Sequence, residues 1–296
     1  MRRARRSGRL PRPLRFGLAV AKFLVVAEIV LVVAFWLGQD YLIFPGRFTQ
    51  GRADVSVGQR SDMEIVRLTT RSGARVAALF GRAKGARRDP RTTVLYFYGN
   101  GSCIQHTRET AFEDLRAMGF DVFVPDYVGY GMSSGRPSEN GCYETATAAY
   151  EYLVRKRGID PEHIVIAGWS LGSAVAIDLA SRRPAKAIAL FSPFTSIEEV
   201  GRSRMPVFPF EADLLRSRFD NRSKIGRIRC PVFIAYGESD IIVPPELSRR
   251  VAGAFTGPVT VVKSPGAGHI DMESGGDVPG RQALRRFIRG TRGDDE

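Results

Sequence analysis

The chain has 296 residues, of which 44% are hydrophobic and 25% charged, and its formal net charge is +13. This length suits one globular domain of about 250 residues with an appendage. The charge is uneven, because residues 1–15 contain seven arginines and no acid, which leaves +6 for the remainder. Neither zinc-finger spacing nor a basic stripe with interleaved aromatic residues is present, so the charge does not indicate a nucleic-acid partner.

Residues 16–37 form an apolar stretch in which only Lys22 and Glu28 are charged. As a helix, these residues would be about 33 Å long, which is enough to cross the hydrocarbon core of a membrane. Phe35 and Trp36 suit the far interface. We therefore expect a single-pass anchor whose arginine-rich tail, residues 1–15, stays in the cytoplasm, with the rest of the chain on the extracytoplasmic side.

Two other interpretations of this stretch remain open. A cleaved signal peptide would release the domain as a secreted or periplasmic protein. Its small-residue cleavage site could lie near Ala34, although the apolar run continues to Leu37. An amphipathic surface helix is less favoured, since the stretch shows no polar face.

Beyond the apolar stretch, strand and helix patterns alternate over residues 41–290. This alternation predicts an α/β fold with a mostly parallel central sheet and helices on both faces. Ligands of such sheets bind beyond the carboxyl ends of the strands. We expect strands at 64–70, 75–80, 92–98, 121–125, 163–168, 186–191, 231–236 and 259–263, helices at 107–118, 142–157, 171–183, 245–255 and 279–290, and an irregular insertion at 193–229.

The pentapeptide Gly168–Gly172 has the pattern Gly-x-Ser-x-Gly and lies between an expected strand and an expected helix. A strand, a sharp turn and a helix expose the central serine, Ser170, as a nucleophile. The glycines are needed because side chains two residues either side of the serine would collide across the tight turn. Ser170 is therefore the candidate catalytic nucleophile.

Ser170 needs a general base, and His269 is the candidate because it directly follows the last expected strand. The other two histidines fit less well. His106 precedes a helix on a different loop, and His163 begins the strand at the opposite end from Ser170. The order serine, acid, histidine along the chain is that of α/β-hydrolases.

The acid that orients the base should come between Ser170 and His269, after a strand. Asp240 follows the expected strand 231–236 and fits this position. Glu238 and Asp271 are its nearest rivals, and we expect both to be solvated surface carboxylates.

The oxyanion of an acyl-transfer reaction needs two backbone N–H donors. We expect one from Leu171, directly after the nucleophile, and the other from Asn100 in the glycine-rich loop after strand 92–98. Tyr98, Gly99 and Trp169 neighbour these donors and are the expected substrate-binding residues. The alternative for the loop is an ordinary Gly-Asn-Gly turn.

The chain has three cysteines, and none has metal-ligand spacing. We therefore expect neither a metal nor a cofactor. One alternative is that all three cysteines are free thiols. The other is that one pair forms a disulfide in an oxidising compartment, and Cys103 and Cys142 are then the better candidates. A second glycine-rich loop, residues 126–134, lacks phosphate-loop spacing and is expected to shape the site.

Together these motifs resemble the membrane-anchored α/β-hydrolase-domain proteins, often described as serine aminopeptidase-like hydrolases. Members include esterases, protein depalmitoylating thioesterases and lysophospholipases. The resemblance covers about residues 41–290 and implies the roles given above to Ser170, Asp240, His269, Asn100 and Leu171. One position departs from the family: most members have histidine where this chain has Tyr98. That histidine supports the oxyanion loop. Tyr98 can also donate a hydrogen bond, so the resemblance leaves open how the Asn100 amide is held here. The motifs are 96–101, 126–131, 168–172, 192–194, Asp240 with Val243-Pro244, and Gly268-His269.

The insertion 193–229 lies where this fold carries its lid, and it is both apolar and basic. An apolar pocket under a basic rim would suit an acyl chain on an anionic or membrane-bound substrate. The alternative is core packing with a solvated basic face. The apolar residues are Phe194, Met205, Val207, Phe208, Phe210, Leu214, Leu215 and Phe219, and the basic ones are Arg202, Arg204, Arg216, Arg218, Arg222, Lys224, Arg227 and Arg229.

The sequence thus predicts a serine hydrolase that cleaves carboxylic esters or thioesters through an acyl-enzyme. A peptidase is the second hypothesis, and Glu211 or Asp213 could then bind a substrate amino group. The third hypothesis is a non-catalytic binding protein on the same fold.

Overall fold

The computed structural model describes residues 12–52, 62–84, 89–204, 212–273 and 278–290. The chain forms two units, residues 1–39 and residues 40–296. Helix α1 (Arg12–Ile43) contains the predicted apolar stretch and continues beyond it at both ends. By length and composition, α1 is able to cross a membrane. Most of the predicted arginine-rich tail, residues 1–11, lies outside the described residues.

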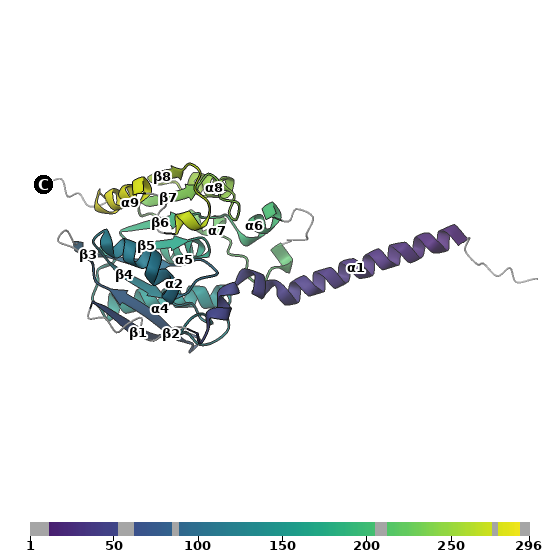
Figure 1. Cartoon of the computed structure of the whole chain (residues 1–296), viewed down its shortest axis with the longest axis horizontal. Coiled ribbons are helices and arrows are strands. Elements are labelled where there is room, and N and C mark those ends of the chain that lie inside the picture. Colours follow the sequence, from purple (N-terminus) through teal and green to yellow (C-terminus); the bar gives the residue numbers. More distant parts are fainter. Residues whose placement is uncertain (1–11, 53–61, 85–88, 205–211, 274–277, 291–296) are drawn as a thin grey trace, which may run out of the picture. The chain divides into compact units, whose positions relative to one another are not determined.

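The second unit is built on an eight-stranded sheet with the order β1-β2-β4-β3-β5-β6-β7-β8 (Figure 1). β2 pairs antiparallel with β1 and β4, and all other neighbours are parallel, as the alternation of strands and helices predicts. The strands are β1 (Met63–Thr69), β2 (Arg75–Gly81), β3 (Asp89–Phe97), β4 (Phe120–Pro125), β5 (Ile164–Trp169), β6 (Ala187–Phe191), β7 (Val232–Gly237) and β8 (Val259–Ser264).

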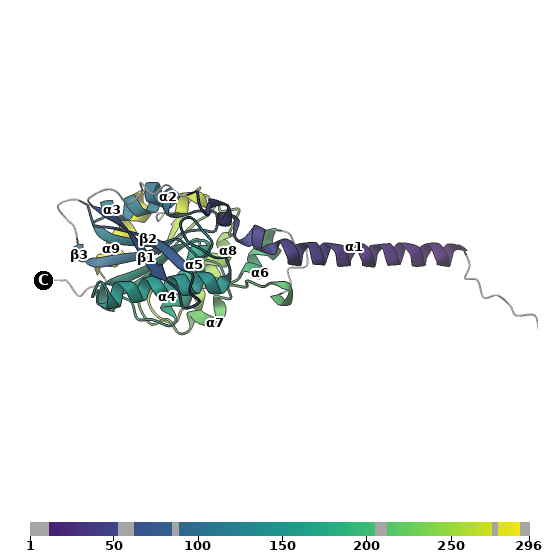
Figure 2. The same cartoon turned by 90° about the horizontal axis from the view of Figure 1, so that it is seen from below.

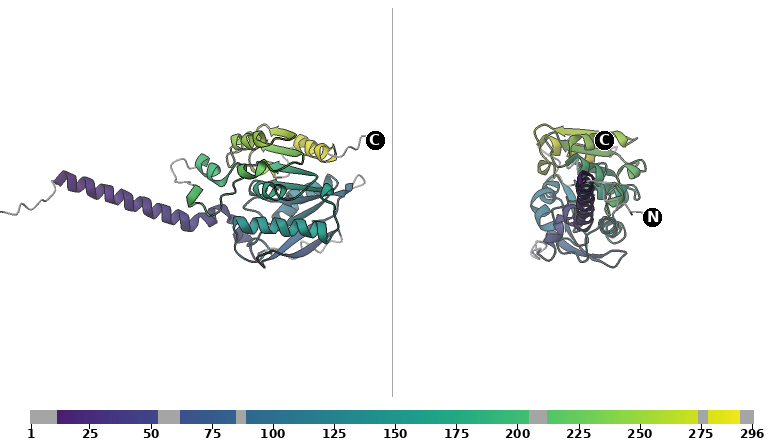
Figure 3. Two further views of the ribbon diagram at one scale, coloured as in Figure 1. Left: turned by 180° about the vertical axis from the view of Figure 1, so that it is seen from behind. Right: turned by 90° about the vertical axis from the view of Figure 1, so that its right-hand side faces the viewer.

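Helices cover both faces of this sheet. Figure 2 shows α3 and α9 on one face and α4 and α7 on the other, and Figure 3 shows the α4 face from behind. The central strands are consequently apolar along their whole length, and β5, β6 and β7 are almost entirely buried. The helices are α2 (Ile104–Thr107), α3 (Glu113–Ala117), α4 (Glu139–Arg155), α5 (Leu171–Ala180), α8 (Pro245–Ala254) and α9 (Val278–Gly290).

The predicted helix 107–118 is not one helix. It is divided into α2, a π-helical turn η3 (Arg108–Phe112) and α3, with non-helical torsion angles at Thr110. The Thr110 hydroxyl donates to the carbonyl groups of His106 and Thr107, in competition with the helical hydrogen bonds. Similarly, α4 begins three residues earlier than predicted, because the Ser138 side chain caps it by accepting from Gly141 N–H.

The insertion 193–229 is not irregular throughout, since it contains α6 (Ile197–Arg204), a 3₁₀ turn η5 (Ala212–Leu214) and α7 (Arg222–Ile225). Phe194, Leu215 and Phe219 are buried in the domain, which agrees with core packing rather than with an open apolar pocket. Four of the apolar residues assigned to the insertion, Met205, Val207, Phe208 and Phe210, lie outside the described residues.

The basic residues of the insertion are largely paired with acids. Lys224 contacts Asp178 at 3.2 Å. The other pairs are Arg202 with Glu198, Arg216 with Asp40, Arg218 with Asp213 and Arg222 with Glu199. Arg204, Arg227 and Arg229 instead donate to backbone carbonyl groups, so the described part of the insertion keeps a partly neutralised basic surface.

The three cysteines are free thiols, which is one of the two alternatives that the sequence left open, and the Cys103–Cys142 pair is not formed. Cys103 precedes α2, and Cys142 lies on the buried side of α4. Burial raises the pKa of both thiols, and it raises the pKa of Cys230 to about 11. These cysteines behave as small apolar side chains of the core.

Candidate active site

Ser170 stands at a sharp turn between β5 and α5. Its φ of 54° and ψ of −120° are unusual for a residue with a side chain. A β-carbon on Gly168 would lie 2.1 Å from the Gly172 carbonyl oxygen, and one on Gly172 would lie 1.9 Å from the Phe97 carbonyl oxygen. Only glycine fits at both positions. The turn thus has the geometry that the pentapeptide predicts.

The structure brings Ser170, His269 and Asp240 into one hydrogen-bonded row. His269 Nε2 lies 2.9 Å from Ser170 Oγ, and His269 Nδ1 lies 2.7 Å from Asp240 Oδ2. The three residues follow β5, β8 and β7, so the parallel sheet delivers them to the same edge. This arrangement allows the imidazole to take a proton from the serine while the carboxylate holds the ring in one tautomer.

The Asp240 carboxylate is buried, with an exposed fraction of 4%, and every oxygen is engaged. Oδ1 accepts from the N–H groups of Ile242 and Val243, and Oδ2 also accepts from the Ser192 hydroxyl at 2.9 Å. Burial opposes ionisation, but the hydrogen bonds from His269, Val243 and Ser192 outweigh it and hold the pKa of Asp240 below its ordinary value. Asp240 is therefore an ionised carboxylate at neutral pH.

Ser192 is a site residue to which the sequence analysis gave no role. It follows β6 with a φ of 45°, and its side chain is fully buried against Asp240. A signal was present, because Ser192-Pro193 follows a buried strand on the same edge of the sheet as Ser170. Neither the positive φ nor the contact with Asp240, 48 residues further on, follows from that pattern.

The predicted oxyanion loop packs directly on the Ser170 turn. Gly172 lies so close to the loop that its β-carbon would be 2.8 Å from the Tyr98 carbonyl oxygen, and a β-carbon on Gly99 would be 2.8 Å from the Trp169 ring. Trp169 in turn donates from Nε1 to the His269 carbonyl at 3.1 Å. Leu171 begins α5, next to Ser170. The two predicted oxyanion donors, in Asn100 and Leu171, thus belong to segments in backbone contact.

Tyr98 lies beneath this loop and not on its surface, since its side chain is fully buried. Its hydroxyl donates to Asp126 Oδ1 at 2.9 Å and accepts from Tyr127 N–H at 3.1 Å. Asp126 also accepts from the N–H groups of Ile104 and Met132. Tyr98 therefore has the position of a support for the loop, and its predicted contact with substrate stays a prediction.

Asp126 is the second residue whose role the sequence analysis missed. It is completely buried and joins the loop after β3 to the glycine-rich loop after β4. Burial raises the pKa of this carboxyl, against the hydrogen bonds from Met132, Ile104 and Tyr98. A β-carbon on Gly131 would lie 2.1 Å from Asp126 Oδ2, so this loop can close over the carboxylate only with glycine.

The other two histidines lie elsewhere, as the topology predicts. His106 is exposed in α2, and His163 ends a 3₁₀ turn (Pro161–His163) before β5, at the opposite end of that strand from Ser170. Of the two acids considered for an amino-group site, Asp213 is fully exposed in its side chain and paired with Arg218. Glu211 lies outside the described residues.

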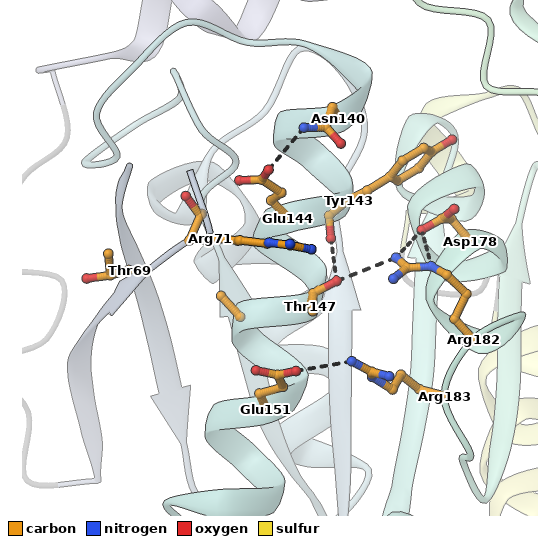
Figure 4. A pocket seen from close by; sticks show the side chains of 12 residues that line it. Thr69, Arg71, Asn140, Tyr143, Glu144, Thr147, Glu151, Asp178, Arg182 and Arg183 are labelled. Carbon is orange, nitrogen blue, oxygen red and sulfur yellow. Dashed lines mark hydrogen bonds and ion pairs between the residues drawn. The ribbon is translucent and has the colours of Figure 1, made fainter. Parts of the chain in front are cut away.

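A separate polar hollow of about 620 Å³ opens between β1 and the helices α4 and α5 (Figure 4). Two of its three arginines, Arg182 and Arg183, are paired with Asp178 and Glu151, and the third is Arg71. The hollow thus contains charges that are largely matched within it and none of the residues of the Ser170 site. Within the described ranges, we find no group of three histidine, cysteine or acidic side chains that could hold a metal ion.

Three comparisons place this geometry among known proteins. A family model described as the alpha/beta hydrolase fold matches residues 92–223. Alpha/beta hydrolase domain-containing protein 17B of Xenopus tropicalis is 32% identical over 240 residues, which is 80% of each chain. An uncharacterized protein of Mycobacterium tuberculosis is 41% identical over 180 residues, which is 60% of this chain and 63% of the relative's length.

The structural comparison agrees in fold. The esterase Pf2001 of Pyrococcus furiosus superimposes with a TM-score of 0.64 at 18% identity, over 77% of this chain and 92% of that one. At this identity the likeness concerns the fold alone.

Proposed function

The chain belongs to the membrane-anchored α/β-hydrolase-domain family, and within that family we propose that it is a serine hydrolase that cleaves acyl esters or thioesters. The observation that carries this proposal is the row of hydrogen bonds from Ser170 Oγ through His269 to the buried Asp240 carboxylate. A strained serine with a histidine at 2.9 Å has little structural purpose and fits nucleophilic catalysis.

In the proposed mechanism, Ser170 Oγ attacks the acyl carbonyl as His269 Nε2 takes its proton. The N–H groups of Asn100 and Leu171 stabilise the oxyanion. His269 then protonates the leaving alcohol or thiol, and the acyl group remains on Ser170 as an ester. In the second half, water attacks this ester as His269 Nε2 takes its proton; His269 then returns the proton to Ser170 Oγ as the acyl–oxygen bond breaks and the carboxylic acid leaves. Asp240 keeps its negative charge throughout and stabilises the imidazolium.

Exposed aliphatic side chains at the site support an acyl substrate. Ile241 follows Asp240 directly and is 71% exposed, and Ile270 follows His269 and is 76% exposed. Ile242 is 44% exposed. Ile241 and Ile270 directly follow Asp240 and His269 in the chain, so an acyl chain that covers them would remove apolar surface from water.

We also propose a location. The apolar helix α1 is the membrane anchor, with the arginine-rich residues 1–15 in the cytoplasm and the hydrolase domain on the extracytoplasmic side. Protease added to sealed cells or spheroplasts then degrades the domain while the protein stays in the membrane fraction. Degradation only after the membrane is opened contradicts this orientation, and a soluble domain cut near Ala34 supports a signal peptide instead.

The catalytic proposal is tested on the detergent-solubilised full chain. A fluorophosphonate probe should label the wild type and not Ser170→Ala, while Ser181→Ala, a serine substitution far from the site, keeps wild-type labelling. A panel of acyl esters and acyl thioesters from two to sixteen carbons then defines the substrate class. Ile270→Ser should lower kcat/KM more for a dodecanoyl than for an acetyl ester.

The alternatives give different results. Hydrolysis of amino-acid amides at rates above those of the esters would favour the peptidase hypothesis. Wild-type protein that is folded but takes up no fluorophosphonate and hydrolyses no ester or thioester of any chain length would refute the enzyme and favour the binding protein.

A further inference from the structure

The segment directly after the membrane-spanning helix is hydrogen-bonded to the oxyanion loop. We call residues 43–51 the juxtamembrane segment; it begins at the last residue of α1 and includes the 3₁₀ helix η1 (Pro45–Thr49). Gly46 N–H donates to the Asn100 carbonyl at 2.9 Å. Asn100 Nδ2 donates to the Ile43 carbonyl at 3.2 Å. Asn100 is thus held on its main chain and on its side chain by residues more than 50 positions earlier.

The fit around Gly46 is tight. A β-carbon there would lie 2.0 Å from Tyr130 Cε1 and 2.8 Å from the Asn100 carbonyl oxygen. The Tyr130 hydroxyl donates to that same oxygen at 3.0 Å, so both acceptor positions of the Asn100 carbonyl are filled. Any side chain at position 46 would therefore displace the tyrosine or the loop.

Thr49 ties the juxtamembrane segment to the second glycine-rich loop. Its hydroxyl donates to the Gly46 carbonyl at 2.6 Å and accepts from Gly131 N–H at 3.0 Å. Gly51 N–H donates to the Gly131 carbonyl at 2.8 Å. Gly131 lies against Asp126, the buried carboxylate that holds the oxyanion loop from its other side. The loop is therefore fixed from two directions.

From these contacts we propose that the juxtamembrane segment positions the oxyanion donor of Asn100, with Gly46 and Thr49 as the positioning residues. The inference rests on the proposed function, in which Asn100 N–H stabilises the oxyanion. Neither Gly46 nor Thr49 touches the reacting atoms. They act by fixing the Asn100 carbonyl and side chain, and through them the direction of its N–H. Such donors are effective only when they are preorganised.

The experiment compares Gly46→Ala with wild type in the full chain, with Gly253→Ala as the control because a β-carbon at position 253 meets nothing within 4 Å. We expect kcat of Gly46→Ala to fall at least tenfold while KM stays within twofold, as for a contact made only in the transition state. Affinity for an alkyl boronic acid, which forms a tetrahedral adduct on Ser170, should fall by the same factor.

A milder pair of variants covers the case in which Gly46→Ala does not fold. Thr49→Val keeps the shape and removes both hydroxyl hydrogen bonds, and we expect kcat to fall roughly threefold to tenfold. Thr49→Ser keeps the hydroxyl and should restore most of the rate. Active-site titration with the fluorophosphonate normalises every rate to the folded, reactive fraction.

The outcomes separate this inference from the proposed function. If the wild type hydrolyses esters and Thr49→Val has wild-type kcat per titrated site, the inference is wrong and the proposed function stands. A fall in activity that disappears on normalisation to titrated sites also overturns it, since the role is then structural. If the wild type hydrolyses neither an ester nor a thioester, the proposed function fails and the inference fails with it.

Discussion

Replacing Tyr98 by phenylalanine removes one hydroxyl beneath the oxyanion loop and leaves the ring in place. That hydroxyl donates to the buried Asp126 carboxylate at 2.9 Å and accepts from Tyr127 N–H at 3.1 Å. A hydrogen bond to a charged group contributes about 1.5–3 kcal/mol, and a buried N–H left without a partner costs about 1–3 kcal/mol. We therefore expect the free energy of unfolding to fall by about 3–5 kcal/mol, which lowers Tm by roughly 10 °C for a domain of this size.

The effect should depend on pH in a defined direction. Burial raises the pKa of Asp126 above its ordinary value, and the Tyr98 hydroxyl opposes this by donating to the charged form. Without the hydroxyl the pKa in the folded state rises further. The loss of stability is then largest above that raised pKa, where the carboxylate is charged, and it shrinks as pH falls below it.

Thermal unfolding of the full chain in detergent, at pH 7.5 and at pH 4.5, checks both statements. Tyr150→Phe is the matched control, because it removes one hydrogen bond to the Pro184 carbonyl far from the site and should cost about 1 kcal/mol. We also expect kcat of Tyr98→Phe to fall roughly fivefold to tenfold, as the loop loses its support. A change in Tm no larger than that of Tyr150→Phe, together with wild-type kcat, would refute the reasoning.

Three further predictions follow from the site and the core. Asp240→Asn should lower kcat by about 10³–10⁴-fold, measured with the ester that the wild type cleaves best. The pKa of Asp240 is lowered in the folded state. Its contribution to stability is therefore present above its ordinary pKa and is lost as pH falls through its pKa in the folded protein. We expect the Tm of Asp240→Asn to change less than the Tm of wild type between pH 5 and pH 2. Gly172→Ala should yield insoluble protein, since its β-carbon would overlap the Phe97 carbonyl oxygen; a soluble, active Gly172→Ala would contradict the geometry. Mass spectrometry after alkylation in denaturant without reductant should find three modified cysteines, whereas one modified cysteine would indicate a disulfide.

Much of the fold could be predicted because each strand carries its signal locally. All eight strands lie within a few residues of their expected bounds, since short apolar or alternating runs flanked by polar loops can be recognised without long-range information. The helices of the insertion were harder to predict. Its short helices α6 and α7 have few residues on which a periodicity could show. The break at Thr110 depends on a side-chain hydrogen bond that competes with the backbone.

The candidate site likewise has residues that could be predicted and residues that could not. Ser170, Asp240 and His269 each follow a parallel strand, and the carboxyl ends of parallel strands meet at one edge of a sheet, so topology alone brings them together. The supports of the site are different. Ser192 reaches Asp240 by a positive φ, and Asp126 reaches Tyr98 through a buried hydrogen bond. No periodic pattern in the sequence predicts either contact.

Local patterns in the chain were sufficient to predict the approximate bounds of the strands, the glycines of the nucleophile turn and the three residues of the hydrogen-bonded row. Only the tertiary structure decided that Tyr98 supports the loop from below and that the juxtamembrane segment holds Asn100 from outside. The physical reason is the sequence separation over which each interaction acts. Periodicity and turn chemistry act within a few residues, whereas the contact of Gly46 with Asn100 joins backbone groups that become neighbours only when the sheet has formed.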